Sequence, residues 1–374
     1  MDRSLPTVLP EAPSSQAVIP DVSIIVPARN EEANIGDCLE SLTSQTGVKF
    51  EIIVVDDGST DRTRAIAEGI AGVRVISPGA PSEGWTGKNN ALAAGAKAAR
   101  AAWLLFTDAD TVHRPGSLGR ALAEAKTERA DLLSYSPEQV VVTFAERAAM
   151  PVIFAELAAQ YPLRRVREQD AGAVAANGQY ILVRRAAHDA VGGHAAVATE
   201  ILEDVALARR FRDAGKRVYF RYGGDAVRTR MYRNWPELRE GWTKNLALLF
   251  PQPERLARQS VFLWLMAWLA LAVAALGAVG GHYLWIALAA LWLLLYRRIR
   301  AANFATENNL MAISFGPPIF AYLLLRSKKA HADGRVSWKG RTYAIGASNE
   351  NVLAQIQSAK PISKMESPKL RTGN

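Results

Sequence analysis

Two aspartates one residue apart, Asp108 and Asp110, follow a short apolar run at residues 102–107. The run is typical of a buried strand, so both acids are expected at its carboxyl end, the edge of an open α/β sheet at which ligands bind. Side chains at positions i and i+2 of an extended segment point the same way. Two such carboxylates can hold Mg²⁺ or Mn²⁺ against substrate phosphates. A solvated loop start would contain the same pattern, so the rest of the chain has to decide.

Two earlier strands, predicted over 22–27 and 51–56, also run into polar residues at their carboxyl ends. A nucleotide lying across this edge of the sheet needs acceptors for its base and ribose, and Asp56 or Asp57 can supply them. The alternative is a turn that caps the next helix, which the segment 57–61 (DGSTD) would serve equally well.

A glycine-rich segment at 84–90 (GWTGKNN) precedes a predicted helix. Glycines allow close backbone approach, helix amides favour anions, and Lys88 adds a positive charge, so the segment resembles a phosphate-binding loop. It lacks the G-x-x-x-x-G-K-[ST] pattern, and an ordinary turn into a helix is the alternative.

A second acidic pair, Glu203 and Asp204, lies in a helix predicted over 199–214. Acids near a helix start can simply stabilise the helix dipole. In an enclosed site, one of them can instead act as the general base toward an attacking hydroxyl group.

Strand-like and helix-like stretches alternate from residue 21 to about residue 250 and must position these groups. Short, nearly continuous Val, Ile and Leu runs are typical of strands covered on both faces, and the alternation predicts a doubly wound, mostly parallel α/β sheet with helices on both faces. The first strand is not followed by the G-x-G-x-x-G pattern of a dinucleotide site. Strands are expected at 22–27, 51–56, 73–77, 102–107, 131–135 and 181–183, and helices at 32–44, 61–70, 88–101, 116–127 and 199–214.

The composition bounds the possible partners. The chain has 374 residues, a net charge of +9 and one cysteine, Cys38, which is expected in a core helix. The basic clusters 297–300 and 326–329 lack the interleaved aromatics of a nucleic-acid platform and flank apolar runs instead, so we expect no nucleic-acid partner. A single cysteine cannot form a disulfide within the chain, which fits a reducing compartment.

Three apolar runs indicate a membrane region at 251–330. Runs 261–279 and 283–296 carry no charge, and we expect them to form a membrane hairpin. The third run, 310–325, contains Gly-Pro-Pro and is expected to be broken, re-entering the membrane or lying in its interface. The positive-inside rule then places the α/β domain, 21–250, on the cytoplasmic side of a bacterial-type inner membrane with a multi-pass anchor.

Three further segments complete the predicted organisation. Residues 1–20 are expected to form a flexible arm, and 331–374 a basic, polar tail on the cytoplasmic side. An amphipathic stretch at 144–167 could rest on the bilayer, or cover the sheet as amphipathic helices more commonly do.

The order of these motifs resembles that of the family 2 glycosyltransferases of the GT-A fold. The resemblance covers about residues 21–250. The membrane region, together with 338–343 (WKGRTY), is similar to a narrower group, the hopanoid-biosynthesis-associated and carotenoid-acid glycosyltransferases. Each motif is weak alone, whereas the whole set in this order is specific. The motifs are PARNEE at 27–32, VVDDGSTD at 54–61, GWTGKNNAL at 84–92, TDAD at 107–110, NGQ at 177–179, GGH at 192–194 and ED at 203–204.

The resemblance implies inverting transfer of a hexose from a nucleotide-diphosphate sugar, usually a UDP-sugar, to a lipid acceptor of terpenoid type. It implies that Asp108 and Asp110 hold the nucleotide ribose and a divalent metal, Mg²⁺ or Mn²⁺, with Asp110 the direct ligand. Asp204 would be the general base, with Glu203 beside it. The residues implied along the nucleotide sugar are Pro27, Arg29, Glu31, Asp56, Asp57, Lys88, Asn89 and Asp108.

The region after the second acidic pair departs from the processive members of the family, which carry Q-x-x-R-W. Here residues 228–235 read RTRMYRNW, without the Gln and at a different spacing, so a single transfer is favoured over polymer synthesis. Packing of Trp235 against the body is an equal alternative. On the acceptor and leaving-group side we expect Asn177, Gln179, Arg230, Arg233 and Trp235.

Two other functions fit the same residues. A polyprenyl-phosphate sugar synthase has a phosphate as acceptor, which is already ionised and needs no strong general base. A catalytically silent membrane scaffold could keep the fold, although the intact acids Asp108, Asp110 and Asp204 argue against it.

Overall fold

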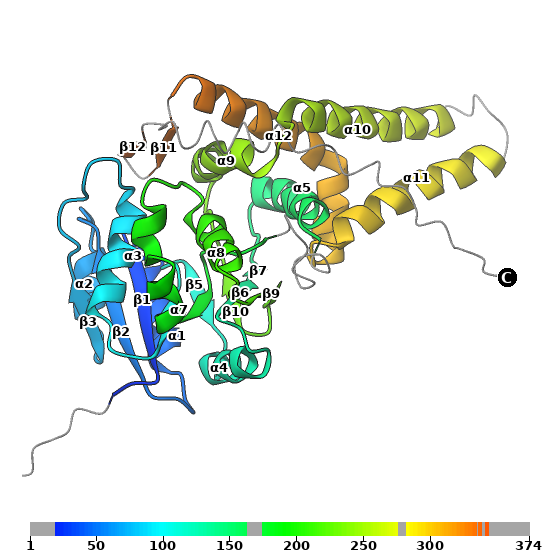
Figure 1. Ribbon diagram of the computed structural model, residues 1–374. Helices are drawn as coiled ribbons and strands as arrows, with labels where there is room; N and C mark the ends of the chain where they lie inside the picture. The colour runs from blue at the N-terminus through cyan, green and yellow to red at the C-terminus, as the bar shows by residue number, and fades with distance from the viewer. Residues whose placement is uncertain (1–18, 163–173, 276–281, 335, 339–340, 344–374) are drawn as a thin grey trace, which may run out of the picture.

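A seven-stranded sheet forms the centre of the protein in the computed structural model, which describes residues 19–162, 174–275, 282–334, 336–338 and 341–343 (Figure 1). Its strand order is β3-β2-β1-β4-β8-β6-β9. β8 runs antiparallel to β4 and β6, and the other neighbours are parallel, which confirms the predicted α/β class with a mostly parallel, GT-A-type sheet. The strands are β1 Val22–Ala28, β2 Phe50–Asp56, β3 Val73–Ile76, β4 Trp103–Phe106, β6 Leu132–Ser136, β8 Ile181–Arg184 and β9 Val218–Tyr222.

Helices alternate with these strands and cover both faces of the sheet. A second, small sheet has the order β5-β10-β7, and its strands were not anticipated from the sequence because each is three residues or shorter. The helices of the body are α1 Ile35–Thr43, α2 Thr63–Glu68, α3 Gly87–Ala98, α4 Ser117–Thr127, α7 Arg185–Ala190, the 3₁₀ turn η1 Gly193–Val197 and α8 Glu203–Asp213, and the short strands are β5 Thr111–His113, β7 Glu138–Gln139 and β10 Val227–Thr229.

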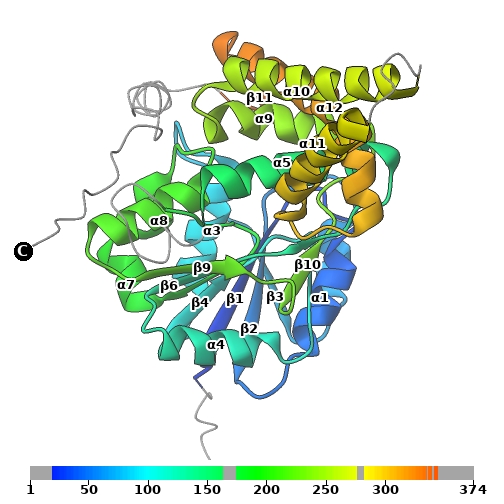
Figure 2. The same cartoon turned by 90° about the vertical axis from the view of Figure 1, so that its right-hand side faces the viewer.

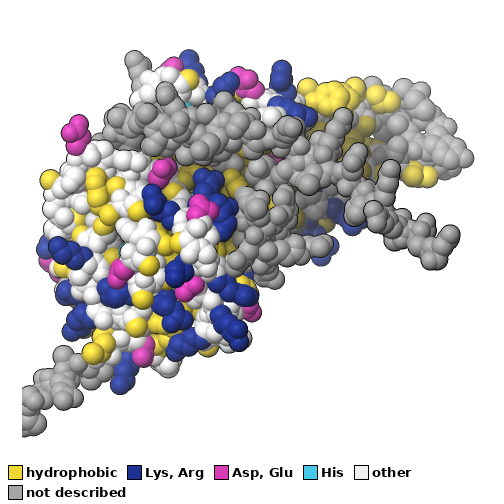
Figure 3. All heavy atoms as spheres, in the orientation of Figure 1, with side chains coloured by type: hydrophobic (Ala, Val, Ile, Leu, Met, Phe, Trp, Pro, Cys, Tyr) yellow, Lys and Arg dark blue, Asp and Glu magenta, His cyan; other side chains and the backbone are white. Residues whose placement is uncertain are grey.

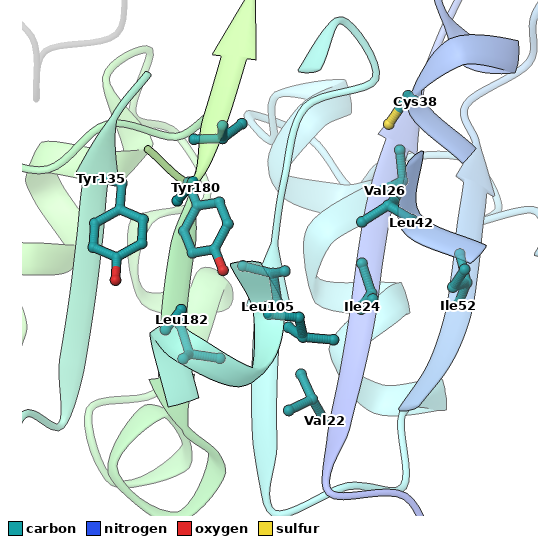
Figure 4. Packing of buried hydrophobic residues seen from close by; sticks show 14 of the residues in the cluster. Val22, Ile24, Val26, Cys38, Leu42, Ile52, Leu105, Tyr135, Tyr180 and Leu182 are labelled. Carbon is teal, nitrogen blue, oxygen red and sulfur yellow. The ribbon is translucent and has the colours of Figure 1, made fainter. Parts of the chain in front are cut away.

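Alternate residues of the central strands enter two separate cores, as the two-residue period of a strand requires. Ile24 of β1 and Ile52 of β2 point into the core that contains Cys38 and Leu42 of α1 (Figure 4). Their neighbour Ile25 belongs to the core on the opposite face, under α3 and α8. Cys38 is fully buried, as expected.

A third core joins the body to the C-terminal helices, which lie above the sheet in Figure 2. Ile153 of α5, Trp242 of α9 and Phe320 of α12 belong to it. α5 therefore packs against helices of this layer, and residues 163–167 of the predicted amphipathic stretch lie outside the described residues. The elements are α5 Phe144–Gln160, α9 Trp235–Leu249, α10 Pro253–Ala275, α11 His282–Arg300 and α12 Thr306–Ala332, followed by the hairpin β11 Val336–Trp338 and β12 Arg341–Tyr343.

The third apolar run is one continuous helix, so the prediction that its prolines break it is wrong. α12 contains Pro317 and Pro318 in its interior. Pro318 has no N–H to donate to the carbonyl of Ser314, four residues earlier. The indole Nε1 of Trp264 on α10 donates to that carbonyl instead, at 2.8 Å. A neighbouring helix thus satisfies the group that the proline leaves free, which is the condition for a proline inside a membrane helix.

Two helices are long and apolar enough to cross a membrane, Pro253–Val273 and Thr306–Ala332. The predicted membrane hairpin consisted of α10 and α11, whereas the second helix that meets this criterion is α12. In α11 the uncharged stretch 282–296 is shorter than the ~20 residues that a span needs, because arginines occupy positions 297, 298 and 300. Residues 276–281 of the expected hairpin, and residues 1–18 and 344–374 of the expected arm and tail, lie outside the described residues.

α10 carries an exposed apolar surface. Phe262, Leu265 and Leu269 are each about half exposed or more. Figure 3 shows hydrophobic side chains gathered over this helix, whereas Lys and Arg are spread over the visible face of the body. Large exposed apolar patches mark protein or membrane contacts.

Gly95 of α3 provides a test of the close packing between α3 and the sheet. A Cβ at this position would lie 2.4 Å from Ile25 Cγ2 and 3.0 Å from Val55 Cγ2. Gly95→Ala should therefore lower the free energy of unfolding by about 1–3 kcal/mol, the usual cost of overpacking. The matched control is Gly36→Ala in α1, where the nearest atom lies at 3.9 Å and a gain of up to about 1 kcal/mol is expected. Equal stabilities of the two variants in chemical denaturation would contradict this account.

Candidate active site

A cavity of about 410 Å³ lies at the carboxyl ends of β1, β2 and β4 and extends to α5, α9 and the turn between α11 and α12. Its sheet side is charged. Its opposite side is apolar and includes Phe154 and Leu157 of α5, Trp242 and Leu249 of α9, and Ala302 of the turn. The charged side chains that line it are Arg29, Glu31, Asp57, Lys88, Asp108, Asp110, Glu203, Asp204 and Lys244.

Asp108 and Asp110 lie in the turn between β4, which ends at Phe106, and β5. The expectation that both continue an extended strand is wrong, and the turn is what brings both residues to the cavity. Two hydroxyl groups fix the backbone of this turn. The carbonyl of Asp108 accepts from Thr111 Oγ1 at 2.7 Å, and the carbonyl of Asp110 accepts from Thr229 Oγ1 at 3.1 Å.

A buried polar network supports the turn from below. Thr107 Oγ1 donates to the carbonyl of Gln179 at 2.8 Å and lies 3.0 Å from Thr111 Oγ1. The His113 ring contacts both threonines at 3.2 Å. Burial lowers the pKa of His113 to about 3, so the imidazole is neutral. Since the network joins β5 to the segments that follow β4 and precede β8, no local sequence pattern indicates it.

Lys88 connects the two acidic pairs. It lies in the first turn of α3, whose N-cap Thr86 accepts from the backbone of Asn89. The Nζ atom is 2.9 Å from Asp108 Oδ1 and 2.7 Å from Glu203 Oε1. Burial opposes the charge on Lys88, but the two carboxylates together raise its pKa well above the usual value. The side chain is therefore an ammonium that holds α3, the β4–β5 turn and α8 together.

Asp204 lies beside this ion-pair chain. Its Oδ2 accepts from the backbone of Gly178 at 2.8 Å, and its Oδ1 accepts from the backbone of Val205 at 2.8 Å. Burial, followed by the charge of Glu203, raises the pKa of Asp204 to about 6, while Lys88 and the two N–H groups lower it. A carboxylate with this pKa is ionised at neutral pH and basic enough to serve as a general base.

Gly178 lets the cluster close, and sequence reasoning missed it. A Cβ at this position would lie 3.2 Å from Lys88 Nζ and 3.3 Å from Glu203 Oε1. Its neighbours Asn177 and Gln179, both predicted, line the cavity. The Nε2 of Gln179 donates to Thr229 Oγ1 at 3.2 Å. The glycine stood in the quoted N-G-Q motif, but its role depends on contacts with α3 and α8.

Four predicted residues from the ends of β1 and β2 are brought together at the same cavity: Pro27, Arg29, Glu31 and Asp57. Arg29 Nη1 donates to the carbonyl of Asp57 at 2.6 Å, which ties the two loops to each other. Asp57 is almost fully buried. These residues form the end of the cavity farthest along the sheet from β8.

Asp56 and Asn89 are not among the described residues that line the cavity. Asp56 Oδ2 lies 3.7 Å from Arg64 Nη1, and its Oδ1 accepts from the backbone of Ser59 at 3.2 Å. Asn89 is fully buried, and its Nδ2 lies within 3.1 Å of three carbonyls of the segment 197–200. Both side chains therefore fix loops next to the site.

The three residues expected on the acceptor side after β10, Arg230, Arg233 and Trp235, are also not among the described residues that line the cavity. Arg230 forms an ion pair with the buried Glu146 of α5 at 3.2 Å. Arg233 donates to the carbonyl of Ala33 and to Asn34 Oδ1, at the start of α1. Trp235 stacks on Tyr322 of α12, with the ring centroids 6.1 Å apart. The alternative interpretation of Trp235, packing against the rest of the protein, agrees with this geometry.

α9 supplies cavity residues that the sequence prediction did not assign: Lys244 and Asn245. They belong to the segment WTKN at 242–245, whose Trp242 packs in the third core. A polar pair directly after an apolar anchor on an amphipathic helix was the available signal. That signal could not identify which face of the helix meets the acidic cluster.

The acids present suit a hard divalent cation that a phosphate-bearing ligand completes. Within the described residues, no group of three or more His, Cys, Asp or Glu side chains is arranged to hold a metal ion. Asp108 and Asp110 nevertheless both line the cavity. One or two carboxylates, with the remaining positions taken by water and substrate phosphates, is the usual setting of Mg²⁺. The donor set therefore fits Mg²⁺ or Mn²⁺.

The chain is similar to several known proteins. The 4,4'-diaponeurosporenoate glycosyltransferase of Staphylococcus aureus is 28% identical over 343 residues, covering 87% of this chain and 88% of the relative. Among solved structures, a mannosyltransferase of Pyrobaculum calidifontis in complex with GDP-mannose and Mn²⁺ has a TM-score of 0.49 and 18% identity, covering 87% of this chain and 89% of that one. Glucosyl-3-phosphoglycerate synthase of Mycobacterium tuberculosis with Mn²⁺ and UDP-glucose has a TM-score of 0.42 and 22% identity, covering 61% and 78%.

The family model for glycosyl transferase family 2 matches residues 23–192, which include β1 to β8 and the turn with Asp108 and Asp110. The acids Glu203 and Asp204 lie beyond the matched region and line the same cavity. Residues 23–192 therefore match a glycosyl transferase family 2 domain, and the protein is a glycosyltransferase.

Proposed function

We propose that the protein is a membrane-attached, inverting glycosyltransferase that moves a hexose from a nucleotide-diphosphate sugar, a UDP-sugar by expectation, to a lipid acceptor of terpenoid type. One observation carries the proposal. A single cavity joins the charged cluster around Asp108, Lys88 and Asp204 to an apolar wall built by α5, α9 and the turn after α11. A donor with phosphates suits the first side, and an acceptor with a long apolar body suits the second.

The donor would lie along the carboxyl edge of the sheet. Asp57 would accept from the nucleotide base, since it lines the cavity and is held by Arg29 through its carbonyl. Asp108 would face the ribose and the metal, and Asp110 would be the direct metal ligand. A divalent cation bound there would neutralise charge that builds on the leaving diphosphate. Lys88 is placed to move from its carboxylate partners toward the same phosphates.

Asp204 would act as the general base. The acceptor hydroxyl attacks the anomeric carbon, its proton passes to Asp204, and the bond between that carbon and the phosphate oxygen breaks with inversion. The backbone contacts from Gly178 and Val205 fix the carboxylate while leaving it basic. Glu203 is held by Lys88 and contributes charge rather than taking the proton.

The acceptor assignment rests on the apolar wall and on the relatives. The Staphylococcus aureus relatives are named for glycosyl transfer with diaponeurosporenoate, a carotenoid acid. A hopanoid- or carotenoid-like acceptor would be drawn from the inner leaflet, because α10 and α12 have the length and apolarity of membrane spans and α12 packs directly on α5 and α9. We place the α/β body on the cytoplasmic side, where nucleotide sugars are made available.

The defining experiment supplies full-length protein in lipid nanodiscs with UDP-glucose, Mn²⁺ and a terpenoid acceptor. Formation of a glycosylated lipid together with UDP supports the proposal. A parallel comparison of lipid extracts from a deletion strain and its parent identifies the natural product. If the protein bound no UDP-sugar and the deletion strain lacked no glycolipid of its parent, the scaffold interpretation would be favoured.

Asp110→Asn tests the metal site. The variant removes one of two anionic donors, so Mn²⁺-dependent binding of UDP should weaken about a hundredfold and turnover should be lost. Calorimetric titration of UDP with and without Mn²⁺ measures the effect. Asp37→Asn on the exposed face of α1 is the matched control and should bind as the unaltered protein does. Equal binding by both variants would remove Asp110 from the metal site.

Asp204→Asn tests the general base. With a hydroxyl acceptor, kcat should fall by about 10²–10⁴. The base must be deprotonated, so the rate of the unaltered enzyme should fall as the pH drops below about 6, the pKa of Asp204. Glu203→Gln should shift this limb to lower pH, because the charge of Glu203 raises that pKa. If Asp204→Asn had the same pH–rate profile as the unaltered enzyme, the result would favour a phosphate acceptor and hence the polyprenyl-phosphate function.

Gly178→Ala tests the close approach of the cluster. The added Cβ would press on Lys88 and Glu203 and displace them by a few tenths of an ångström. Because small misplacements of reacting groups are costly, kcat should fall tenfold or more with little change in the melting temperature. Gly36→Ala, whose added Cβ meets only an ordinary contact, should keep full activity. A fully active Gly178→Ala enzyme would show that the cluster tolerates a wider spacing.

A further inference from the structure

Lys244 is a cavity residue with no role in the function proposed above. It lies on α9, half-buried, and lines the cavity together with Asn245. The Oδ1 atom of Asn245 is buried without a hydrogen-bond partner in the described structure. Burial lowers the pKa of Lys244, while the charges of Glu203, Asp108 and Asp204 raise it, so the side chain lies in the field of the acidic cluster. α9 thus points a cation and an amide at the place where the donor is expected.

The position of Lys244 is fixed by α12. Ser327 of α12 is fully buried, and its hydroxyl donates to the carbonyl of Thr243 at 2.7 Å and accepts from the backbone N–H of Ala247 at 2.8 Å. These two groups are the ends of one i to i+4 hydrogen bond of α9. The Nε2 atom of His331 lies 2.8 Å from the carbonyl of Lys244 itself. Two side chains of one candidate membrane helix therefore hold the turn of α9 that carries Lys244.

The cavity contains more acids than cations, so a negatively charged diphosphate that enters it needs a cation such as Lys244. The described lining contains six acids and three cations, the cations being Arg29, Lys88 and Lys244. Lys88 balances Asp108 and Glu203, so if it turns toward the phosphates those two acids lose its charge and a second cation is needed. Arg29 is bound to the loop after β2. Arg230 and Arg233, which sequence reasoning placed on the leaving group, contact Glu146 and the start of α1 instead.

We propose that Lys244 binds the β-phosphate of the donor and stabilises the leaving diphosphate, and that Ser327 is the positioning residue that holds it there. When the bond between the anomeric carbon and the β-phosphate oxygen breaks, the electron pair stays on that oxygen and Lys244 donates a hydrogen bond to it. The acceptor oxygen forms the new bond to the anomeric carbon, and its proton goes to Asp204. Asn245 can contribute a second polar contact from the same turn.

This inference rests on the proposed function, since it takes a nucleoside diphosphate as the leaving group. The test uses full-length protein in nanodiscs, with UDP and UMP titrated separately in the presence of Mn²⁺. UMP lacks the β-phosphate and so reports on the rest of the nucleotide site. Lys244→Met should weaken UDP binding by roughly tenfold or more, as expected for the loss of a charged hydrogen bond, and leave UMP binding within twofold.

Lys244→Arg should recover part of the UDP affinity, because it keeps the charge. Lys97→Met, at an exposed lysine of α3, is the matched control and should bind both nucleotides normally. Ser327→Ala should lower UDP affinity in the same selective way but by less, since Lys244 is displaced rather than removed. A variant that had merely lost its fold would lose UMP binding as well.

The outcomes separate cleanly. Equal loss of UDP and UMP affinity in Lys244→Met, or a change only in the KM for the acceptor, overturns the role of Lys244. Selective loss in Lys244→Met with an unaffected Ser327→Ala overturns the role of Ser327. If the unaltered protein binds neither nucleotide, the proposed function itself has failed, whatever the variants do.

Discussion

The bridge from Lys88 to Asp108 and Glu203 is the interaction on which the site depends. Two carboxylates from different elements face one cavity, and leaving either uncompensated there would cost several kcal/mol. Lys88 compensates both at 2.7–2.9 Å. Because it lies at the start of α3, it also sets the distance between the β4–β5 turn and α8. The donor-side geometry therefore follows from one helix start, fixed in turn by Thr86 and by the contacts of Asn89 with the segment 197–200.

The bridge also bears on how a donor would bind. Lys88 supplies the counter-charge of Asp108 and Glu203, a role that a bound metal–diphosphate complex would share. On donor binding, the positive charge of the metal would replace that of Lys88 beside the acids, so the carboxylates would not be left without a counter-charge. The raised pKa of Asp204 comes from burial and from Glu203. Under the proposed mechanism both would persist while Lys88 changes partners, so Asp204 would stay basic through the reaction.

Local pattern was sufficient for six of the seven strands of the main sheet, for most of the helices between them and for the two acidic pairs, but β9 and α7 were missed. Alternation of side chains between two faces predicts β1 and β2, and the ends of those strands bring Arg29 and Asp57 together at one edge. What escaped prediction depends on residues far apart in the chain. The carbonyl of Ser314 accepts a hydrogen bond from Trp264 of another helix, so α12 continues through its prolines. Arg233 contacts Ala33, two hundred positions away, and no spacing rule reports such a pairing.

The third core connects the C-terminal helices, which include the two candidate membrane spans, to α9, which lines the cavity. α9 contributes Trp242 to that core and Lys244 to the cavity from one turn of the helix. α12 holds α9 through Ser327 inside the hydrogen-bond ladder, a contact that requires the two helices to stay in register. A shift of α12 by even one residue would withdraw the hydroxyl and leave a buried N–H and carbonyl to find new partners. The position of α12 therefore bears directly on the position of Lys244, so under the proposed mechanism a candidate membrane helix and the chemistry of the cavity would not vary independently.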